Sequence, residues 1–430
     1  MKYKSFLIIL FVFYINNCRM PSNPNGEITI VKRIDIIDTG GNCLDVDVDI
    51  QDSILVVAAN YNGYFIYELI SNNGMIAGIN TEKIIHVSAD EMFVSQGDNR
   101  SQTVTLSKYH DIAFVMDKYD HVWLYKYGEG ASQYIDNFLD ESNCYGGTWL
   151  SVAIDDQLEK VGVYALLKHN TAEEEGANYL EYSTSLVWTN LESVDASSTS
   201  LDGNSPDCEY ITNQDAIAEK IYFNDGILSM AYGELGMKIF QQTDVDVCST
   251  VSELIDLQND SFCLENHENS GDINYERCCE STSCPGGIGQ CPWIAEEGYG
   301  GIFSSAGGIL PQNFVEFDTP GEVEAIYSKE NAIFSGLSNS NGCILTTLDN
   351  DATIISSIQF AIGYTINGIH QDDGLIALAA GHDGVLLYEW NLDEISFMGK
   401  IDTPYANSIK VSGDVIFVAT EDGLEIIQID

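Results

Sequence analysis

The C-terminal stretch from Asn407 to Ile429, NSIKVSGDVIFVATEDGLEIIQI, contains three short apolar runs separated by turn residues. Gly413-Asp414 separates the first run from the second, and Glu421-Asp422-Gly423 separates the second from the third. Asp-Gly pairs favour the tight turns of β-hairpins, and short apolar runs between such turns favour strands. The stretch therefore predicts three consecutive antiparallel strands.

The same pattern recurs one unit earlier, from Asn367 to Tyr388, NGIHQDDGLIALAAGHDGVLLY. The turn glycines Gly384 and Gly423 are 39 residues apart, and Gly342 precedes Gly384 by 42 residues. A repeat of about 40 residues that holds about four strands is typical of one blade of a β-propeller.

Counting these units along the chain predicts an all-β fold, a seven-bladed β-propeller. The predicted blades are residues 44–69, 104–127, 149–191, 217–240, 323–348, 367–388 and 407–429. Residues 28–37 form a further strand that has no blade of its own, and the last blade has only three strands of its own. We expect residues 28–37 to supply the missing outer strand, because closing the ring removes free sheet edges.

The units resemble the LVIVD repeat of exported bacterial propellers. Asp47-Val48-Asp49-Ile50 resembles the first strand of that repeat, and Val415–Ala419 and Gly423–Ile427 resemble its second and third strands. The resemblance is good in the first, sixth and seventh predicted blades, fair in the fourth and fifth, and poor in the second and third. It implies a surface-exposed propeller that binds partners, and it carries no catalytic residue over to this chain.

The N-terminus predicts export. Lys2 and Lys4 precede an apolar run from Phe6 to Ile15, which is typical of a secretory signal and too short for a membrane-spanning helix of roughly 20 residues. Cys18 closes this run and resembles the lipobox cysteine of bacterial lipoproteins, which becomes the acylated N-terminus, although the asparagines before it differ from the usual small residues.

We therefore predict a signal peptide (residues 1–17), a lipid-anchored tether (18–27) and a propeller (28–430). The expected location is the bacterial outer membrane or cell surface, with contact to the membrane through the lipid anchor only. A plain secreted protein is the alternative.

A cysteine-rich segment, residues 245–312, interrupts the repeats and is predicted to be an insertion between blades four and five. It carries six of the chain's 11 cysteines. An oxidising compartment would pair these six, with the connectivity left open. The disulfide candidates are Cys248, Cys263, Cys278, Cys279, Cys284 and Cys291. Zinc is disfavoured because no Cys-x-x-Cys pair occurs there. The insertion is read either as a binding element or as a loop that covers an edge.

The charge of the chain excludes one class of partner. There are 66 acidic and 18 basic residues, giving a formal net charge of −48. A nucleic-acid binder needs a basic surface, so we expect no nucleic-acid partner. Such an acidic surface suits solubility, or alternatively divalent cations. Hydrophobic residues make up 45% of the chain, which is enough for a core.

Candidate site residues are few. Asp45, Asp47 and Asp49 alternate along a predicted strand, so they share one face and form a candidate calcium site. The alternative for Asp47 is a structural role in the repeat. His370 and His382 share the sixth predicted blade and are expected to face one end of the channel, either as a catalytic pair or, as we favour, as structural or solvated side chains. No nucleophile elbow, His-Glu-x-x-His motif or Walker loop occurs.

These observations favour a monomeric binding scaffold of the cell envelope or surface. It would engage a protein or a glycan through one propeller face and the cysteine-rich insertion, with no cofactor except calcium. The alternative is an exported hydrolase or lyase with a metal-assisted site at the channel mouth, because residues from several blades can converge there without forming a motif.

Overall fold

The computed structural model describes most of the repeat region. The described residues are 31–72, 75–88, 101–117, 122–127, 133–139, 147–156, 160–169, 184–192, 208–211, 218–241, 314–349, 352–391 and 394–429. The predicted signal peptide, the tether, residues 28–30 and the six clustered cysteines lie outside them. No helix among the described residues has the length and apolar character needed to cross a membrane.

Within this part of the chain, the strands form seven four-stranded antiparallel sheets. The first sheet consists of β2 (Asp45–Asp49), β3 (Ile54–Ala58), β4 (Tyr64–Asn72) and β5 (Met75–Val87). The second consists of β6 (Ser101–Ser107), β7 (Ile112–Asp117), β8 (Val122–Lys126) and β9 (Gln133–Leu139). The third consists of β10 (Gly147–Asp156), β11 (Lys160–His169), β12 (Thr184–Glu192) and β13 (Cys208–Ile211). The fourth consists of β14 (Lys220–Asn224), β15 (Ile227–Ala231), β16 (Met237–Gln241) and β17 (Phe314–Phe317). The fifth consists of β18 (Val323–Lys329), β19 (Ala332–Leu337), β20 (Gly342–Leu348) and β21 (Ile354–Phe360). The sixth consists of β22 (Gly368–Asp372), β23 (Leu375–Ala379), β24 (Val385–Asn391) and β25 (Glu394–Ile401). The seventh consists of β26 (Ala406–Ser412), β27 (Val415–Thr420), β28 (Gly423–Ile429) and β1 (Val31–Ile37).

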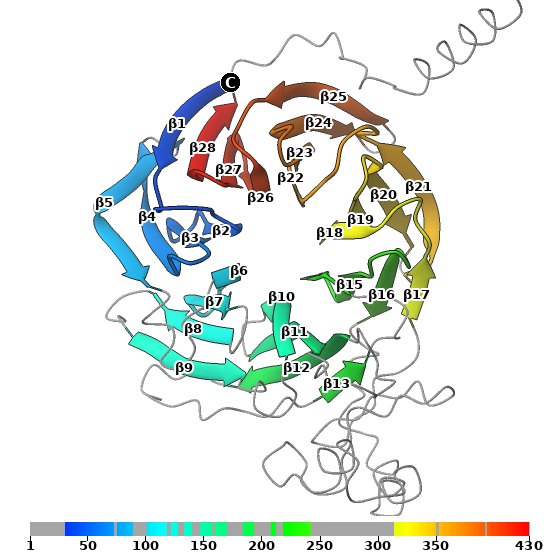
Figure 1. The fold of residues 1–430 in the computed structure, drawn as a ribbon, viewed down its shortest axis with the longest axis horizontal. Helices are drawn as coiled ribbons and strands as arrows, with labels where there is room; N and C mark the ends of the chain where they lie inside the picture. Colours follow the sequence, from blue (N-terminus) through cyan, green and yellow to red (C-terminus); the bar gives the residue numbers. More distant parts are fainter. Residues whose placement is uncertain are drawn as a thin grey trace, which may run out of the picture.

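The sheets are arranged around a central axis, with the first-named strand of each sheet innermost (Figure 1). The prediction of an all-β propeller is thereby confirmed. Each predicted blade range falls within one of these sheets.

The second strand of a sheet is apolar on both faces because each face is covered by a neighbouring sheet. All residues of β7, β19 and β27 are buried, including their polar ones. This removes the usual alternation of apolar and polar residues and explains the continuous runs in the sequence.

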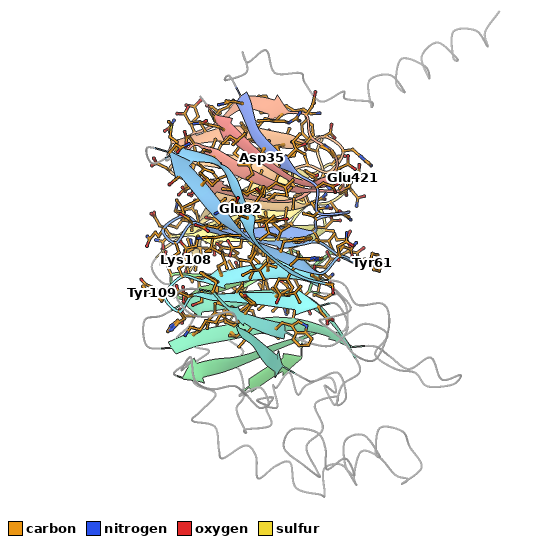
Figure 2. All side chains as sticks on the ribbon, turned by 90° about the vertical axis from the view of Figure 1, so that its left-hand side faces the viewer. Asp35, Tyr61, Glu82, Lys108, Tyr109 and Glu421 are labelled. Carbon is orange, nitrogen blue, oxygen red and sulfur yellow. The ribbon has the colours of Figure 1, made fainter. Side chains whose placement is uncertain are left out.

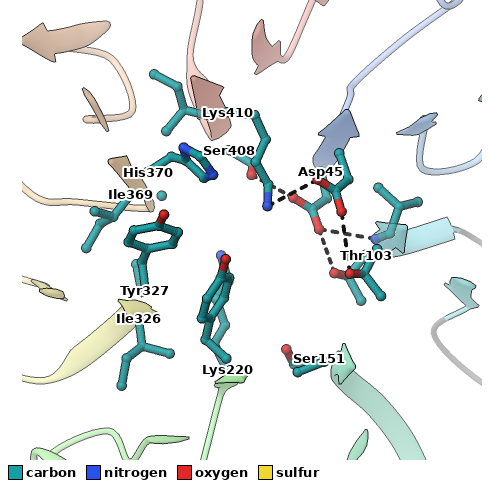
Figure 3. A pocket seen from close by; sticks show the side chains of 18 of the residues that line it. Asp45, Thr103, Ser151, Lys220, Ile326, Tyr327, Ile369, His370, Ser408 and Lys410 are labelled. Carbon is teal, nitrogen blue, oxygen red and sulfur yellow. Dashed lines mark hydrogen bonds and ion pairs between the residues drawn. The ribbon is translucent and has the colours of Figure 1, made fainter. Parts of the chain in front are cut away.

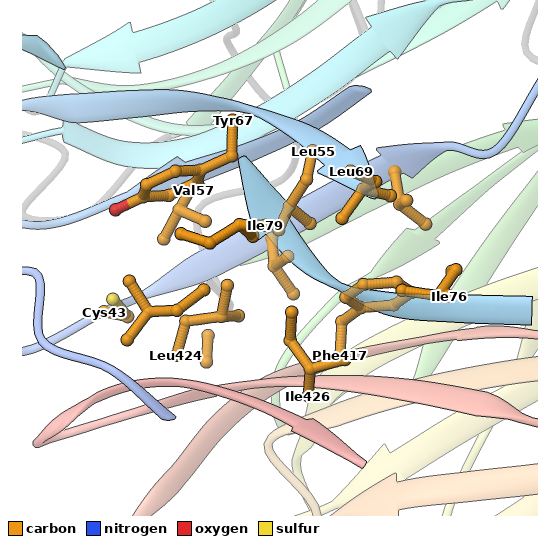
Figure 4. Packing of buried hydrophobic residues seen from close by; sticks show 14 of the residues in the cluster. Cys43, Leu55, Val57, Tyr67, Leu69, Ile76, Ile79, Phe417, Leu424 and Ile426 are labelled. Carbon is orange, nitrogen blue, oxygen red and sulfur yellow. The ribbon is translucent and has the colours of Figure 1, made fainter. Parts of the chain in front are cut away.

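The core lies between adjacent sheets. Between the first and seventh sheets, Leu55 and Val57 of β3 pack with Phe417, Leu424 and Ile426 of the seventh sheet (Figure 4). Corresponding clusters join the first and second sheets, the third and fourth, the fourth and fifth, the fifth and sixth, and the sixth and seventh. Each sheet is thus stabilised by its neighbours, and the ring depends on its closure.

The ring closes at the N-terminal end of the described chain. Strand β1 pairs antiparallel with β28, from Val31 opposite Ile429 to Ile37 opposite Leu424. The N-terminal strand thus occupies the outer position of the seventh sheet, as strand counting predicts for residues 28–37.

The predicted position of the insertion needs a correction. Strand β17 pairs with β16, with Phe314 opposite Phe240, so it belongs to the fourth sheet. In the sequence, residues 242–313 therefore separate the third strand of the fourth sheet from its outer strand, and do not separate the fourth blade from the fifth. The prediction was wrong because it ended the fourth blade at Phe240 and overlooked this outer strand.

Candidate functional site

The first strands of the seven sheets surround a central channel of about 950 Å³. Because these strands are sheet edges, some of their backbone N–H groups face the channel without a strand partner. Figure 3 shows how polar side chains from different sheets converge around this space. Its lining includes charged or polar side chains from all seven sheets.

Asp45 and Asp47 connect the first sheet to its neighbours on both sides. Asp45 Oδ2 accepts from Thr103 Oγ1 (2.6 Å) and from the Val104 amide (3.1 Å), and its Oδ1 accepts from Ser408 Oγ (2.6 Å). Asp47 Oδ2 accepts from the Leu106 amide at 2.9 Å. These carboxylates therefore act as partners for the free edge of the second sheet.

Lys410 of the seventh sheet reaches across to the first. Its Nζ lies 3.3 Å from Asp47 Oδ1. Burial alone would lower the pKa of Lys410, but the charges of Asp47 and Asp45 outweigh burial and raise this pKa. Lys410 is therefore a cation at neutral pH, held in the channel at the junction where the ring closes.

Two tyrosines and a histidine also line the channel. The rings of Tyr222 and Tyr327 have centroids 4.8 Å apart, and those of Tyr327 and His370 are 4.7 Å apart. Tyr327 donates its hydroxyl hydrogen to the Gln371 carbonyl at 2.8 Å. Burial raises the pKa of both tyrosines, so they are neutral phenols.

The protonation state of His370 follows from its partner. Its Nδ1 accepts the Val411 amide at 3.2 Å, so the second ring nitrogen of the neutral imidazole carries the proton. Burial, and then the charges of Lys410, Lys329 and Lys108, hold the pKa of His370 well below 6.5. At neutral pH His370 is a fixed hydrogen-bond donor and lacks a free lone pair for general-base chemistry.

The structure separates the two histidines that the sequence grouped together. His370 lines the channel. His382 lies exposed in the hairpin between β23 and β24, with its ring against Tyr405 at 4.7 Å, and it is not among the channel-lining residues. The expectation that both face one end of the channel is therefore wrong, because the intervening strand β23 carries His382 away from the inner edge.

Asp45, Asp47 and Asp49 all line the channel, as their alternation along one strand predicts. The oxygens of Asp45 and Asp47 are occupied by amides, hydroxyls and Lys410. Asp49 Oδ1 accepts the Gln51 amide at 2.9 Å, and its buried Oδ2 has no partner among the described residues. No group of three metal-ligating side chains is found in the described ranges. Calcium binding by Asp45, Asp47 and Asp49 stays a prediction.

Near one end of the channel, further pairs join neighbouring sheets. Asp372 accepts from Lys329 Nζ (3.0 Å) and from the Gly413 amide (2.9 Å). Burial raises the pKa of Asp372, but that amide and Lys329 outweigh burial and lower it. At the other end of the channel, Lys220 of the fourth sheet donates to the carbonyl of Asn367, which precedes the first strand of the sixth sheet, at 3.0 Å.

The propeller has two faces, which we name after exposed tyrosines. The Tyr109 face carries the hairpins between first and second strands, and the Tyr61 face carries those between second and third strands. Figure 2 shows Lys108 and Tyr109 on one side of the molecule and Tyr61 and Glu421 on the other. Tyr109 is 64% exposed and Tyr61 is 56% exposed.

The two residues that flank residues 242–313, Gln241 and Phe314, lie on the Tyr109 face. Gln241 pairs with Ile227, and Ile227 pairs with Asn224 across the first hairpin of the fourth sheet. Phe314 then pairs with Phe240, so the chain returns at the same rim.

Comparison with known proteins supports the fold. No family model and no curated protein matches the sequence. The solved WD40 repeats of RRP9 superpose with a TM-score of 0.50 at 10% identity, covering 94% of this chain and 100% of that one. The C-terminal WD40 domain of Sif2 gives a TM-score of 0.50 at 12% identity over the same shares of the two chains. By its fold, this chain is similar to WD40-type β-propellers.

Proposed function

We propose that this protein is a binding scaffold that engages a protein partner through the Tyr109 face and residues 242–313. The observation that carries the proposal is the pairing of Phe240 with Phe314, because it fixes both ends of the inserted segment at that face while completing the fourth sheet. Loops displayed from a rigid scaffold commonly carry recognition.

The Tyr109 face also exposes apolar side chains. Two of them are in turns between first and second strands, Ile50 in the first sheet and Tyr109 in the second. Two more, Ile70 and Met75, are in the long β4–β5 hairpin of the first sheet. Each of the four is more than a third exposed. Exposed aromatic and methionine side chains are enriched at protein interfaces. The propellers that resemble this chain in fold are consistent with a protein partner. The alternative of a metal-assisted hydrolase gains no support from the channel, given the side chains described above.

The experiment compares three variants with the wild-type chain from Arg19 onward, each immobilised and exposed to envelope extract. One replaces residues 242–313 with a Gly-Asn-Gly turn, which the pairing of β16 and β17 permits. The second is Tyr109→Asp, and the third is the matched control Tyr61→Asp on the opposite face. The captured partner is identified and then titrated in purified form.

We expect the first two variants to lose the partner and Tyr61→Asp to retain it. Retention by the first two with loss by Tyr61→Asp contradicts the proposal. Capture of a glycan in place of a protein would assign the other ligand class to the same face.

We further propose that Cys18 anchors the scaffold to the envelope. Cys18→Ser is expected to release the protein from the membrane fraction and to abolish incorporation of a labelled fatty acid. Membrane association that persists without Cys18 contradicts this anchor.

A further inference from the structure

Several carboxylates in the channel already accept hydrogen bonds, whereas lysine and histidine N–H groups there have unused hydrogen-bonding capacity. The carboxylates of Asp45, Asp47 and Asp372 are each hydrogen bonded to a backbone amide of a neighbouring sheet and to a side chain. Asp156 likewise accepts from Ser107 Oγ and from the Lys108 amide, both at 2.6 Å. Their oxygens are aimed at strand edges, so they offer little to a ligand.

The donors are less occupied. An ammonium group has three N–H bonds. The contacts within the described residues use one from Lys410 (to Asp47), one from Lys329 (to Asp372) and one from Lys220 (to the Asn367 carbonyl). Lys108 has no ion pair among the described residues, and the second ring N–H of His370 has no hydrogen-bond partner there.

The channel also contains four lysines. The chain has 18 basic residues, and Lys108, Lys220, Lys329 and Lys410 line this one cavity, each from a different sheet. Lys410 and His370 are close together in the channel wall, since the amide of Val411, next to Lys410, donates to His370 Nδ1 at 3.2 Å (Figure 3). Seven carboxylates line the same cavity, but those of Asp45, Asp47, Asp156 and Asp372 already accept hydrogen bonds, so the free N–H groups are the part of the channel that can bind anionic oxygens.

We propose that the channel binds a small organic anion, with its carboxylate or phosphate oxygens at Lys410, His370 and Lys108. This site is independent of the protein-binding face proposed above. A volume of about 950 Å³ accommodates a ligand of ordinary metabolite size. The rings of Tyr222 and Tyr327 beside Lys410 supply an apolar wall for the carbon part of such a ligand.

The channel is lined by seven acidic residues against four lysines, which argues for the opposite sign and shapes the test. Glu219 and Glu324 line the mouth of the channel toward the Tyr61 face, and Asp49 has the orphan oxygen described above. Binding is measured by titration calorimetry on the full chain with citrate as the polycarboxylate probe, inorganic phosphate as the phosphate probe and spermidine as the cationic probe. Citrate alone assigns a carboxylate ligand, phosphate alone assigns a phosphate ester, and spermidine alone overturns the proposal, as does the absence of binding by all three.

The variants separate a binding role from a structural one. Lys108→Ala removes an exposed lysine, and its matched control is Lys83→Ala on β5, outside the channel. We expect Lys108→Ala to weaken the anion about tenfold and Lys83→Ala to leave it unchanged. Equal affinities for these two variants and the wild type would overturn the site.

His370→Asn gives a second test, and this variant should keep the fold. The asparagine oxygen can still accept the Val411 amide, while the second N–H is lost. We expect about a threefold to tenfold loss of anion affinity with an unchanged melting temperature. Lys410→Met is expected to abolish binding. If it also unfolds the chain, the Lys108 and His370 variants decide the outcome.

Discussion

In the fourth and seventh sheets the outer strand does not follow the third strand after a short turn, and in both an ion pair joins the two strands. In the first, fifth and sixth sheets the outer strand follows the third strand after a short turn. In the seventh sheet it comes from the other end of the propeller, and in the fourth it follows residues 242–313. In the third sheet, residues 193–207 separate these two strands. In the fourth and seventh sheets, the third strand carries a buried charge that is paired to an exposed charge on the outer strand.

The two charges occupy the same position in the repeat. Glu425 and Lys238 each stand two places after the turn glycine, at Gly423 and Gly236. Glu425 is 4% exposed and pairs with Arg33 at 3.0 Å, while Lys238 is 4% exposed and pairs with Glu316 at 3.3 Å. The local sheets place Phe65, Ile344 and Leu386 at this position. We infer that the ion pair helps to fix the register of the outer strand against the third strand where no short turn fixes it.

The largest expected effect comes from removing the seventh sheet's outer strand. Deleting residues 28–37 exposes the edge of β28 and the cluster around Phe417, so we expect loss of a single cooperative unfolding transition. By contrast, replacing residues 242–313 with a short turn keeps β17 and should preserve that transition. Calorimetric melting of both variants checks this, and a synthetic peptide of residues 28–37 should restore the first.

The turn glycines should show an effect of intermediate size. An alanine Cβ at Gly423 would meet the Ile37 carbonyl oxygen at 2.3 Å, and one at Gly384 would meet the Ile401 carbonyl oxygen at 2.3 Å. Both glycines have positive φ, so each alanine variant should lose about 2–4 kcal/mol. Only Gly423→Ala should also detach its outer strand, because Ile37 is not tethered by a short turn. Protease sensitivity near residue 37 distinguishes the two variants.

The ion pairs should contribute less, and unequally. Arg33→Met leaves Glu425 buried without its partner, and since Arg33 is 45% exposed we expect a loss of about 2 kcal/mol, below that of a fully buried pair. Glu316→Gln should cost about 1 kcal/mol, because Lys238 keeps the Tyr232 ring at 4.2 Å. Urea denaturation measures both. A larger loss for Glu316→Gln would contradict the proposed compensation.

The smallest effect is a pH dependence of opposite sign in the two sheets. Burial raises the pKa of Glu425 above its usual value of 4.5, although Arg33 opposes this. The folded state then binds more protons than the unfolded state, so the Glu425 contribution to stability falls as pH rises through the window above 4.5. Glu425→Gln should remove that slope.

Burial lowers the pKa of Lys238 below its usual 10.5, although Glu316 opposes this shift. Here the unfolded state binds more protons, so stability rises with pH through the window below 10.5. Lys238→Met should flatten this alkaline slope while leaving the acidic one. The same sign of slope for both groups would contradict this difference.

The sequence predicted the architecture well because glycine turns and apolar runs are local signals. It predicted the closing strand near Ile37 because a sheet of three strands at one end needs a partner. It missed β17 because a strand of only four residues gives little periodicity. A repeated signal was available, since Asp-Thr-Pro follows β17 at Asp318 and follows the outer strand β25 at Asp402.

The candidate site was only partly predictable. Alternation placed Asp45 and Asp47 on the channel, but no local pattern shows that amides of the next sheet occupy their oxygens. The contact of Lys410 with Asp47 joins the seventh sheet to the first, and these sheets are far apart in sequence. Such contacts follow from the closure of the ring, which single-strand periodicity does not encode.

The most direct test of the central claim measures backbone amide exchange at both non-local outer strands. The account predicts that β1 and β17 exchange as slowly as β21 and β25, the outer strands of two local sheets. It also predicts that Glu316→Gln accelerates exchange in β17 alone. Fast exchange of Phe314–Phe317 in the wild-type protein would contradict the account, because the fourth sheet would then end at β16 and the insertion would lie between sheets.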